Sequence, residues 1–193
     1  MNDGLGRWRP RLQGRASLIR SLIHQAAKGN PFFLEASVRT LVEQAMLDGA
    51  PGSYRPTYTP AALQIPATAQ AIVAARIDRL PPADKRLLQA ASVIGKDVPL
   101  PLLETIGEMP DSGLRESLAR LQAAEFLYET RLFPEAEYTI KHALTHEVTY
   151  ASLLQERRRG LHAHIMHTIE SLYGDRLAEY VERLAHHAWH GAV

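Results

Sequence analysis

The sequence predicts a mainly α-helical protein with one short β-hairpin. Apolar residues recur at spacings of three and four over most of the chain, which is the period of a helix with one buried face. Two β-prone runs between residues 126 and 141 break this period, with a proline between them. The 193 residues are 46% hydrophobic and 22% charged, a composition that is typical of a globular protein with a core.

Composition also excludes several functional classes. Lys and Arg number 22 and Asp and Glu 21, so no strong net charge draws the chain to nucleic acid or to an anionic membrane. The absence of cysteine rules out disulfides, thiolate metal sites and a cysteine nucleophile. No apolar run approaches about 18 residues, and the N-terminus lacks the apolar core of a secretory signal. We therefore expect a cytoplasmic protein without a membrane partner.

The first 65 residues divide into a tail, a pair of helices and a linker. Residues 1–20 carry five arginines and one acid among glycines and a proline, which predicts a disordered basic tail; a nucleic-acid-binding arm is the alternative. Residues 21–49 have helical periodicity that is interrupted at Gly29-Asn30-Pro31, and Gly49 is the expected end of the second helix. Three prolines and a glycine predict a semi-extended linker over residues 50–65.

Residues 66–141 predict four helices followed by the hairpin. Pro66 suits the first turn of the first helix, and Asp111 or Ser112 is the expected N-cap of the fourth. The hairpin strands are expected at 126–130 and 138–141. This order is the outline of a winged-helix domain, although a generic α+β domain gives a similar pattern. The expected buried residues of the four helices are Ala69, Ile72, Val73, Ile77 and Leu80, with Arg76 on the same side; Leu87, Leu88, Ala91 and Ile94; Leu102, Leu103 and Ile106; and Leu114, Leu118 and Leu121.

Residues 142–193 predict three further short helices with narrow apolar stripes. Such helices need neighbours to cover their stripes, which indicates the start of a helical array of tetratricopeptide-like type. The sequence ends soon after this array begins, so we expect a truncated chain. The stripes are Leu144, Val148 and Ala151; Leu161, Ile165, Ile169 and Leu172; and Leu177, Val181, Leu184 and Ala188.

Catalytic motifs are missing from the sequence. It contains no phosphate-binding Gly-x-x-x-x-Gly-Lys-Ser/Thr and no apolar strand that ends in magnesium-binding acids. The Gly-x-Ser-x-Gly, His-Glu-x-x-His and Gly-x-Gly-x-x-Gly motifs are missing too. We therefore predict no catalytic residues and no hydrolysis of a nucleoside triphosphate by this chain alone.

Eight of the nine histidines lie at or after residue 142. His142 with His146, and His186 with His190, are pairs four residues apart, so each pair could meet on one helix face and bind a metal. Zinc would need further ligands, for which Glu147 or Glu182 could serve. We favour polar or half-buried histidines within helical hairpins, and hence no metal. The triplet Arg157-Arg158-Arg159 is interpreted as a solvated helix face.

Three stretches resemble one family in order and spacing. Ala27-Lys28-Gly29-Asn30-Pro31-Phe32-Phe33-Leu34-Glu35 resembles the Gly-x-Pro motif in the lid of signal-transduction ATPases with numerous domains, the STAND branch of AAA-like ATPases. The stretch 65–95 resembles the entry to the winged helix of bacterial members, and 138–150 resembles the segment that leaves the wing. The resemblance covers residues 21–193. Its bacterial look-alikes are fused to an adenylate/guanylate cyclase, a protein kinase or a DNA-binding output.

The resemblance implies a nucleotide site that this chain completes only in part. Residues 21–49 would form the lid helices, with Pro31 packed on the adenine ring and Gly29 allowing close approach of the backbone. His142 occupies the position from which a histidine of relatives reaches the β-phosphate of ADP. Ala143 stands where relatives often have Asp, so this chain departs from the full motif. The alternatives are that residues 29–31 only join two helices and that His142 is a capping or core residue.

The resemblance also implies partners and a switching mechanism. ADP or ATP would bind only with an upstream P-loop domain, which the chain lacks. The winged helix would close over ADP in an off state, and exchange for ATP would free the C-terminal helices to bind protein partners.

Two other functions remain open. The first is a DNA-binding winged-helix regulator, but the reading helix expected at 114–124 offers only Arg115, Arg120 and Gln122, with Glu116 beside them. Nucleic acid is therefore not an expected partner. The second is a protein-interaction scaffold built on the C-terminal helices, which is compatible with the switch.

Overall fold

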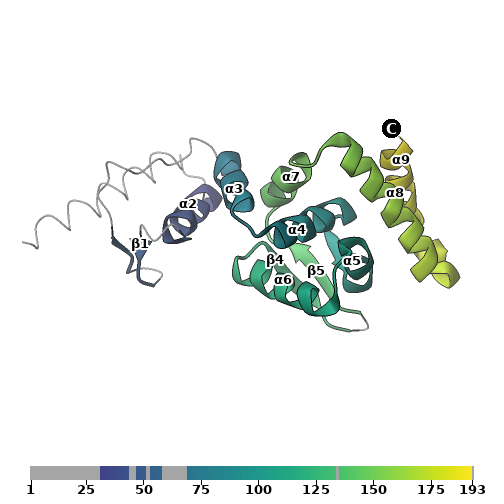
Figure 1. Ribbon diagram of the computed structural model, residues 1–193, viewed down its shortest axis with the longest axis horizontal. Coiled ribbons are helices and arrows are strands. Elements are labelled where there is room, and N and C mark those ends of the chain that lie inside the picture. Colours follow the sequence, from purple (N-terminus) through teal and green to yellow (C-terminus); the bar gives the residue numbers. More distant parts are fainter. Residues whose placement is uncertain (1–30, 44–46, 51–52, 58–68, 134, 193) are drawn as a thin grey trace, which may run out of the picture. The chain divides into compact units, whose positions relative to one another are not determined.

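The computed structural model describes residues 31–43, 47–50, 53–57, 69–133 and 135–192. The chain divides into two compact units, Met1–Arg76 and Ile77–Val193. The expected basic tail, Gly29, Pro66 and most of the expected linker lie outside the described residues. Figure 1 labels the elements of both units, each of which is described by itself below.

The first unit contains α2 (Pro31–Glu43), the short strands β1 (Leu47–Asp48) and β2 (Arg55–Pro56), and most of α3 (Ala69–Asp78). The two strands pair antiparallel, so residues 55–56 of the expected linker belong to a small sheet. The expectation that a helix extends to Gly49 is wrong. Gly49 has φ of +117° and follows β1, where an added Cβ would lie 2.9 Å from the Ser53 oxygen. Its conformational freedom therefore serves a tight turn and not a helix end.

Arg76 is held inside the first unit by an ion pair. Its side chain is 8% exposed, and its Nη2 lies 3.1 Å from Glu43 Oε1. Its Nε donates to the same oxygen at 3.2 Å. Ile72 and Val73 on α3 are buried, so Arg76 does lie on the apolar side of its helix, as predicted, and Glu43 compensates its charge.

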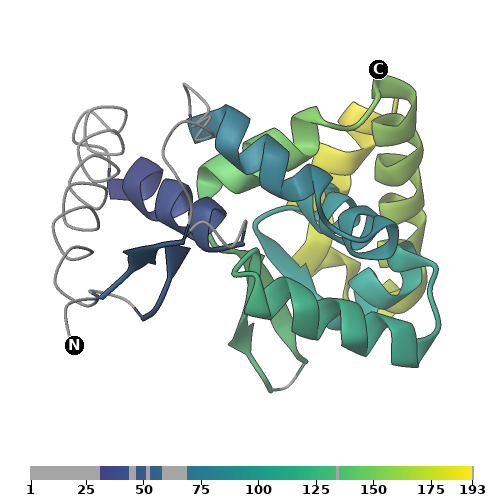
Figure 2. The same cartoon turned by 60° about the vertical axis from the view of Figure 1, so that its left-hand side comes forward.

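The second unit begins with a winged helix. Its elements are, in order, α4 (Pro82–Ile94), β3 (Asp97–Pro99), α5 (Leu100–Gly107), α6 (Asp111–Ala123), β4 (Leu127–Arg131) and β5 (Glu137–Ile140). The sheet is antiparallel with the order β3-β5-β4, and Figure 2 shows the β4–β5 hairpin projecting from the helices. The mainly α fold with a short hairpin is confirmed. Strand β3, which no sequence pattern predicted, adds a third strand beside β5.

The core of the winged helix consists of the predicted apolar stripes. The expected apolar residues of α4, α5 and α6 are all buried. Asp84 is also fully buried, and Arg120 Nε and Nη2 donate to its two oxygens at 2.7 and 2.8 Å, which ties α4 to α6. These hydrogen bonds lower the pKa of Asp84 against the opposing effect of burial. The predicted cap of α6 is wrong, because Pro110 occupies the N-cap position and Asp111 is the first helical residue.

The C-terminal part comprises α7 (Ala143–Ala151), α8 (Gln155–Leu172), the 3-10 helix η2 (Gly174–Tyr180) and α9 (Val181–Ala192). Helices α8 and α9 pack along each other (Figure 1), and α8 also contacts α4 and α5. Leu161, Ile165 and Ile169 are buried as predicted, whereas Leu172 is 44% exposed.

Two of the C-terminal stripes are wrong. Thr145 and Thr149 are the buried residues of α7, one position after the predicted Leu144 and Val148. On α9 His187 is buried and Val181 is 60% exposed. The cause on α9 is close packing, because an added Cβ on Gly191 would lie only 3.4 Å from the Ala163 nitrogen of α8. The face with His187 and Gly191 therefore turns toward α8.

Candidate functional site

Of the predicted site residues, only His142 has a described side chain. Gly29 lies outside the described residues, and Pro31 is the first residue of α2 with an undescribed side chain. His142 is half-buried and is the N-cap of α7, with extended backbone at φ −131° and ψ 136°. Pro31 and His142 belong to different units, so their contact with one nucleotide stays a prediction.

His142 marks a sharp junction between sheet and helix. Strand β5 ends at Ile140, and α7 begins at Ala143, so only two residues connect them. The His146 N–H donates to the His142 carbonyl at 3.1 Å, which starts the helix. The first N–H groups of any helix have no acceptor within that helix, and they favour an anion. The expected junction between wing and helix is therefore present at the predicted residues.

A cavity of about 610 Å³ lies beside this junction. Its lining comes from the end of α4, the sheet, α7 and α9, and it includes Lys141 and Ala143, the two neighbours of His142. His142 itself is not among the residues that line it. The volume falls within the roughly 300–1,000 Å³ of small-molecule sites.

The polar lining of this cavity is basic. Two lysines, Lys96 and Lys141, contribute positive charge, and among the residues that the structure describes no Asp or Glu belongs to the lining. Lys141 Nζ lies 2.7 Å from Glu125 Oε2, so part of its charge is balanced from outside the lining. His146 Nε2 is buried without a hydrogen-bond partner among the described residues. The lining therefore offers donors and cations that suit an anionic ligand.

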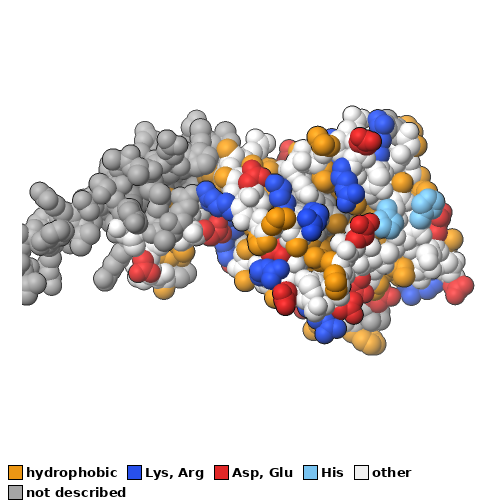
Figure 3. Space-filling model, viewed as in Figure 1, with side chains coloured by type: hydrophobic (Ala, Val, Ile, Leu, Met, Phe, Trp, Pro, Cys, Tyr) orange, Lys and Arg blue, Asp and Glu red, His pale blue; other side chains and the backbone are white. Residues whose placement is uncertain are grey.

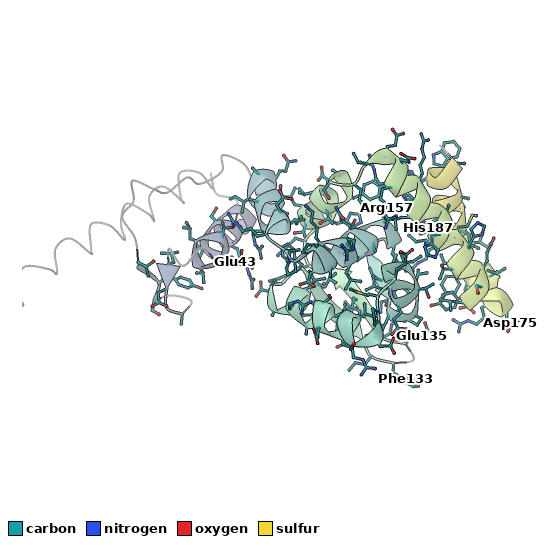
Figure 4. All side chains as sticks on the ribbon, in the orientation of Figure 1. Glu43, Phe133, Glu135, Arg157, Asp175 and His187 are labelled. Carbon is teal, nitrogen blue, oxygen red and sulfur yellow. The ribbon has the colours of Figure 1, made fainter. Side chains whose placement is uncertain are left out.

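One wall of the cavity belongs to a cluster of four histidines, His162, His186, His187 and His190. His162 on α8 and His187 on α9 are each 1% exposed, and their Nδ1 atoms lie 2.8 Å apart. The ring centroid of His186 lies 5.8 Å from that of His162 and 4.5 Å from that of His190. Figure 4 labels His187 where α9 meets α8, and Figure 3 shows histidines at the surface of this helical region.

Three histidines of the cluster, His162, His186 and His187, have lowered pKa values. Burial, followed by the nearby charges of His190, His186 and Arg158, lowers the pKa of His162 to about 4. Burial lowers the pKa of His187 to about 3, with His162, His186 and Arg183 adding to the effect. The pKa of His186 is lowered as well, again mainly by burial. At neutral pH the imidazoles of His162, His186 and His187 therefore each keep a lone pair that can accept a hydrogen bond or bind a metal.

Part of this cluster follows from the sequence. The pair His186 and His190 does meet, as the spacing of four predicts, whereas His162 and His187 were not singled out. One available signal was the position of His162, which lies three residues before Ile165 and seven before Ile169 on the buried face of α8. The contact of His162 with His187 depends on how α8 packs against α9, which no local pattern encodes.

Comparison with known proteins adds no relative. No protein-family model matches the chain, and no curated protein matches it. Within the described residues no helix combines the length and the apolar character needed to cross a lipid bilayer.

Proposed function

We propose that this chain is the regulatory part of a STAND-type ATPase switch. It contributes lid and winged-helix contacts to ADP or ATP and links them to a helical surface that binds proteins. It does not hydrolyse ATP alone, because it lacks the P-loop and the magnesium-binding acids. We place this switch in the cytoplasm.

The observation that carries the proposal is the junction between β5 and α7. His142 lies there at the N-terminus of a helix, and the neighbouring Lys141 and Ala143 line a cavity whose described lining contains no carboxylate. These donors suit the phosphates of a nucleotide, because Lys141 supplies charge and α7 supplies its first N–H groups. His142 lies beside the cavity and not in its lining, so its contact with the β-phosphate is part of the proposal. A bound diphosphate would bias the winged helix toward one of two arrangements, provided that its contacts differ between them.

The exposed apolar side chains of the C-terminal helices support the protein-binding part of the proposal. Leu154 is 80% exposed and Trp189 70%, and both lie in the part of the chain that resembles the start of a tetratricopeptide-like array. Leu154 is the N-cap of α8 and Trp189 lies on α9, and large exposed apolar side chains at such positions favour contacts with further helices or with partners. The protein-interaction scaffold is therefore compatible with the switch.

DNA binding is disfavoured by the partners of two arginines. Arg120, one of the three candidate reading residues, makes two hydrogen bonds to the buried Asp84. In the wing, Arg131 pairs with Glu137. Because both guanidinium groups are held by carboxylates, the surface offers fewer free donors than a groove-reading winged helix needs.

Nucleotide titration tests the proposal. Fluorescent ADP should bind the chain alone weakly, in the millimolar range or above, because most phosphate donors belong to the P-loop domain. If the coding sequence upstream of this chain encodes a P-loop domain, the chain produced together with that domain should bind ADP about 100-fold more tightly or better. Tight binding to the chain alone would refute the partial site, and equal weak binding in both samples would refute the assignment to the switch.

A further inference from the structure

The histidine cluster between α8 and α9 has the composition of a metal site. One ring nitrogen from each of His162, His186 and His187 lies within 4.8 Å of the others. The set contains neither a carboxylate nor a thiolate, and imidazole is the ligand that suits Zn²⁺ and its neighbours in the transition series. The question is whether the arrangement of these three rings fits an ion.

The pair His162 and His187 provides the strongest geometric argument. Their Nδ1 atoms face each other at 2.8 Å in a buried position, so a shared proton has to separate the two lone pairs. A metal ion can take the place of this proton. With Zn–N bonds of 2.0–2.1 Å, a tetrahedral site separates two ligand nitrogens by about 3.3 Å. The two rings therefore need to move apart by only about 0.5 Å.

Tyr150 supplies the outer partner that a metal-binding histidine requires. Its hydroxyl lies 3.1 Å from His162 Nε2, on the other side of the ring from Nδ1. When Nδ1 carries the metal, Nε2 carries the proton and donates it to the tyrosine oxygen. Such a partner fixes the tautomer and the orientation of the ring. Tyr150 on α7 thus orients His162 on α8, so that it can bind a metal together with His186 and His187 on α9.

His186 gives the site its open side. It is exposed, and it also lines the cavity beside the β5–α7 junction. Three protein ligands with one position left for water or an anion is the pattern of zinc sites that exchange a ligand. Arg158 lies near His162 and Arg183 near His187, and their positive charges repel a cation bound by these histidines. An anion in the fourth position would offset this repulsion.

We propose that His162, His186 and His187 bind one Zn²⁺ ion, whose fourth position opens toward the basic cavity. The three ligands are distinct from the residues assigned to the nucleotide switch, although the site borders the same cavity through His186. It joins α8 to α9, so the ion would stabilise the packing of the two C-terminal helices. No metal was expected from the sequence, because the pair His186 and His190 offers too few ligands for zinc and His162 and His187 were not singled out.

Zn²⁺ titration of the untagged full-length chain, freed of metal with a chelator, tests the site. Calorimetry should give one ion per chain with Kd in the micromolar range or below. At an excess of 100 Kd, the unfolding midpoint should rise by at least about 5 °C. Co²⁺ should give the intense visible absorption of a tetrahedral site. Failure of the wild-type chain to bind one equivalent, or a six-coordinate Co²⁺ spectrum, would overturn the proposal.

Variants separate the site from surface histidines. His186→Ala removes an exposed ligand and should weaken Zn²⁺ binding at least about 100-fold without unfolding the chain, and Tyr150→Phe should weaken it about tenfold. The matched control is His167→Ala, an exposed histidine on α8 that pairs with Glu170 and should bind as the wild type does. Wild-type affinity in His186→Ala, or an equal loss in His167→Ala, would show that Zn²⁺ binds elsewhere.

Discussion

Asp84 is the position at which one substitution tests the winged-helix core most sharply. Its carboxylate is fully buried and accepts two hydrogen bonds from Arg120. Asp84→Asn keeps the size of the side chain, removes its charge and turns an amide N–H₂ toward a guanidinium donor. Hydrogen bonds to charged groups contribute about 1.5–3 kcal/mol each. Because the Arg120 side chain is 47% exposed, it can rehydrate, and we expect a loss of only about 2 kcal/mol.

Urea unfolding followed by far-ultraviolet circular dichroism measures this loss. The matched control is Glu116→Gln, because Glu116 lies 3.5 Å from the same guanidinium but is 72% exposed. An exposed pair contributes little, so the control should change the unfolding free energy by less than about 0.5 kcal/mol. If Asp84→Asn costs no more than the control, or if the control costs as much as Asp84→Asn, the buried pair does not stabilise the fold as we argue.

Three further predictions concern acid stability, helix packing and nucleic acid. The pKa of Asp84 is lowered, so its stabilisation is complete above its ordinary value of 3.8 and is lost as pH falls through the lowered pKa. Between pH 5 and pH 2 the free energy of unfolding should therefore fall more steeply for the wild-type chain than for Asp84→Asn. Parallel curves of unfolding free energy against pH would contradict this. Gly191→Leu should cost about 1–3 kcal/mol in chemical denaturation, because an added Cβ would already lie 3.4 Å from the Ala163 nitrogen and the rest of the leucine side chain would press against α8. Gly160→Leu, at a position where nothing lies within 4 Å of an added Cβ, should cost nothing, and equal effects would refute the close packing. In electrophoretic shift assays at about 0.1 M salt the chain should not retard duplex DNA, and a sequence-specific shift would favour the DNA-binding alternative.

Where local pattern and packing agree, the sequence predicted the fold well. Leu88, Leu103 and Leu121 lie on stripes of helical period, and all three are buried in the winged helix. Strand β3 was missed because Asp97, Val98 and Pro99 are too few to show alternation, and because proline argues against a strand. Its pairing with β5 comes from a segment about 40 residues later, which a local pattern cannot indicate.

The candidate site was harder to predict than the fold. The junction at His142 follows from the order of strand and helix, and it was found where expected. The histidine cluster joins residues 25 positions apart, and it depends on the register of α9 against α8. The apolar stripe of α9 predicts that the face with Val181 and Ala188 is buried. In the structure the small Gly191 lets the face with His187 approach α8 instead. A small residue at a helix crossing outweighed the apolar period there.

Nucleotide retention by His142→Ala is the most direct test of the switch. In the complex with the upstream P-loop domain, loss of one hydrogen bond to a charged phosphate should weaken ADP by about 10- to 100-fold. ATP affinity should change by less than about threefold, because in the proposed switch His142 contacts the β-phosphate only in the ADP state. Competition of both nucleotides against fluorescent ADP measures the two affinities. A selective loss of ADP is the predicted result, and an equal loss of both nucleotides would contradict the account.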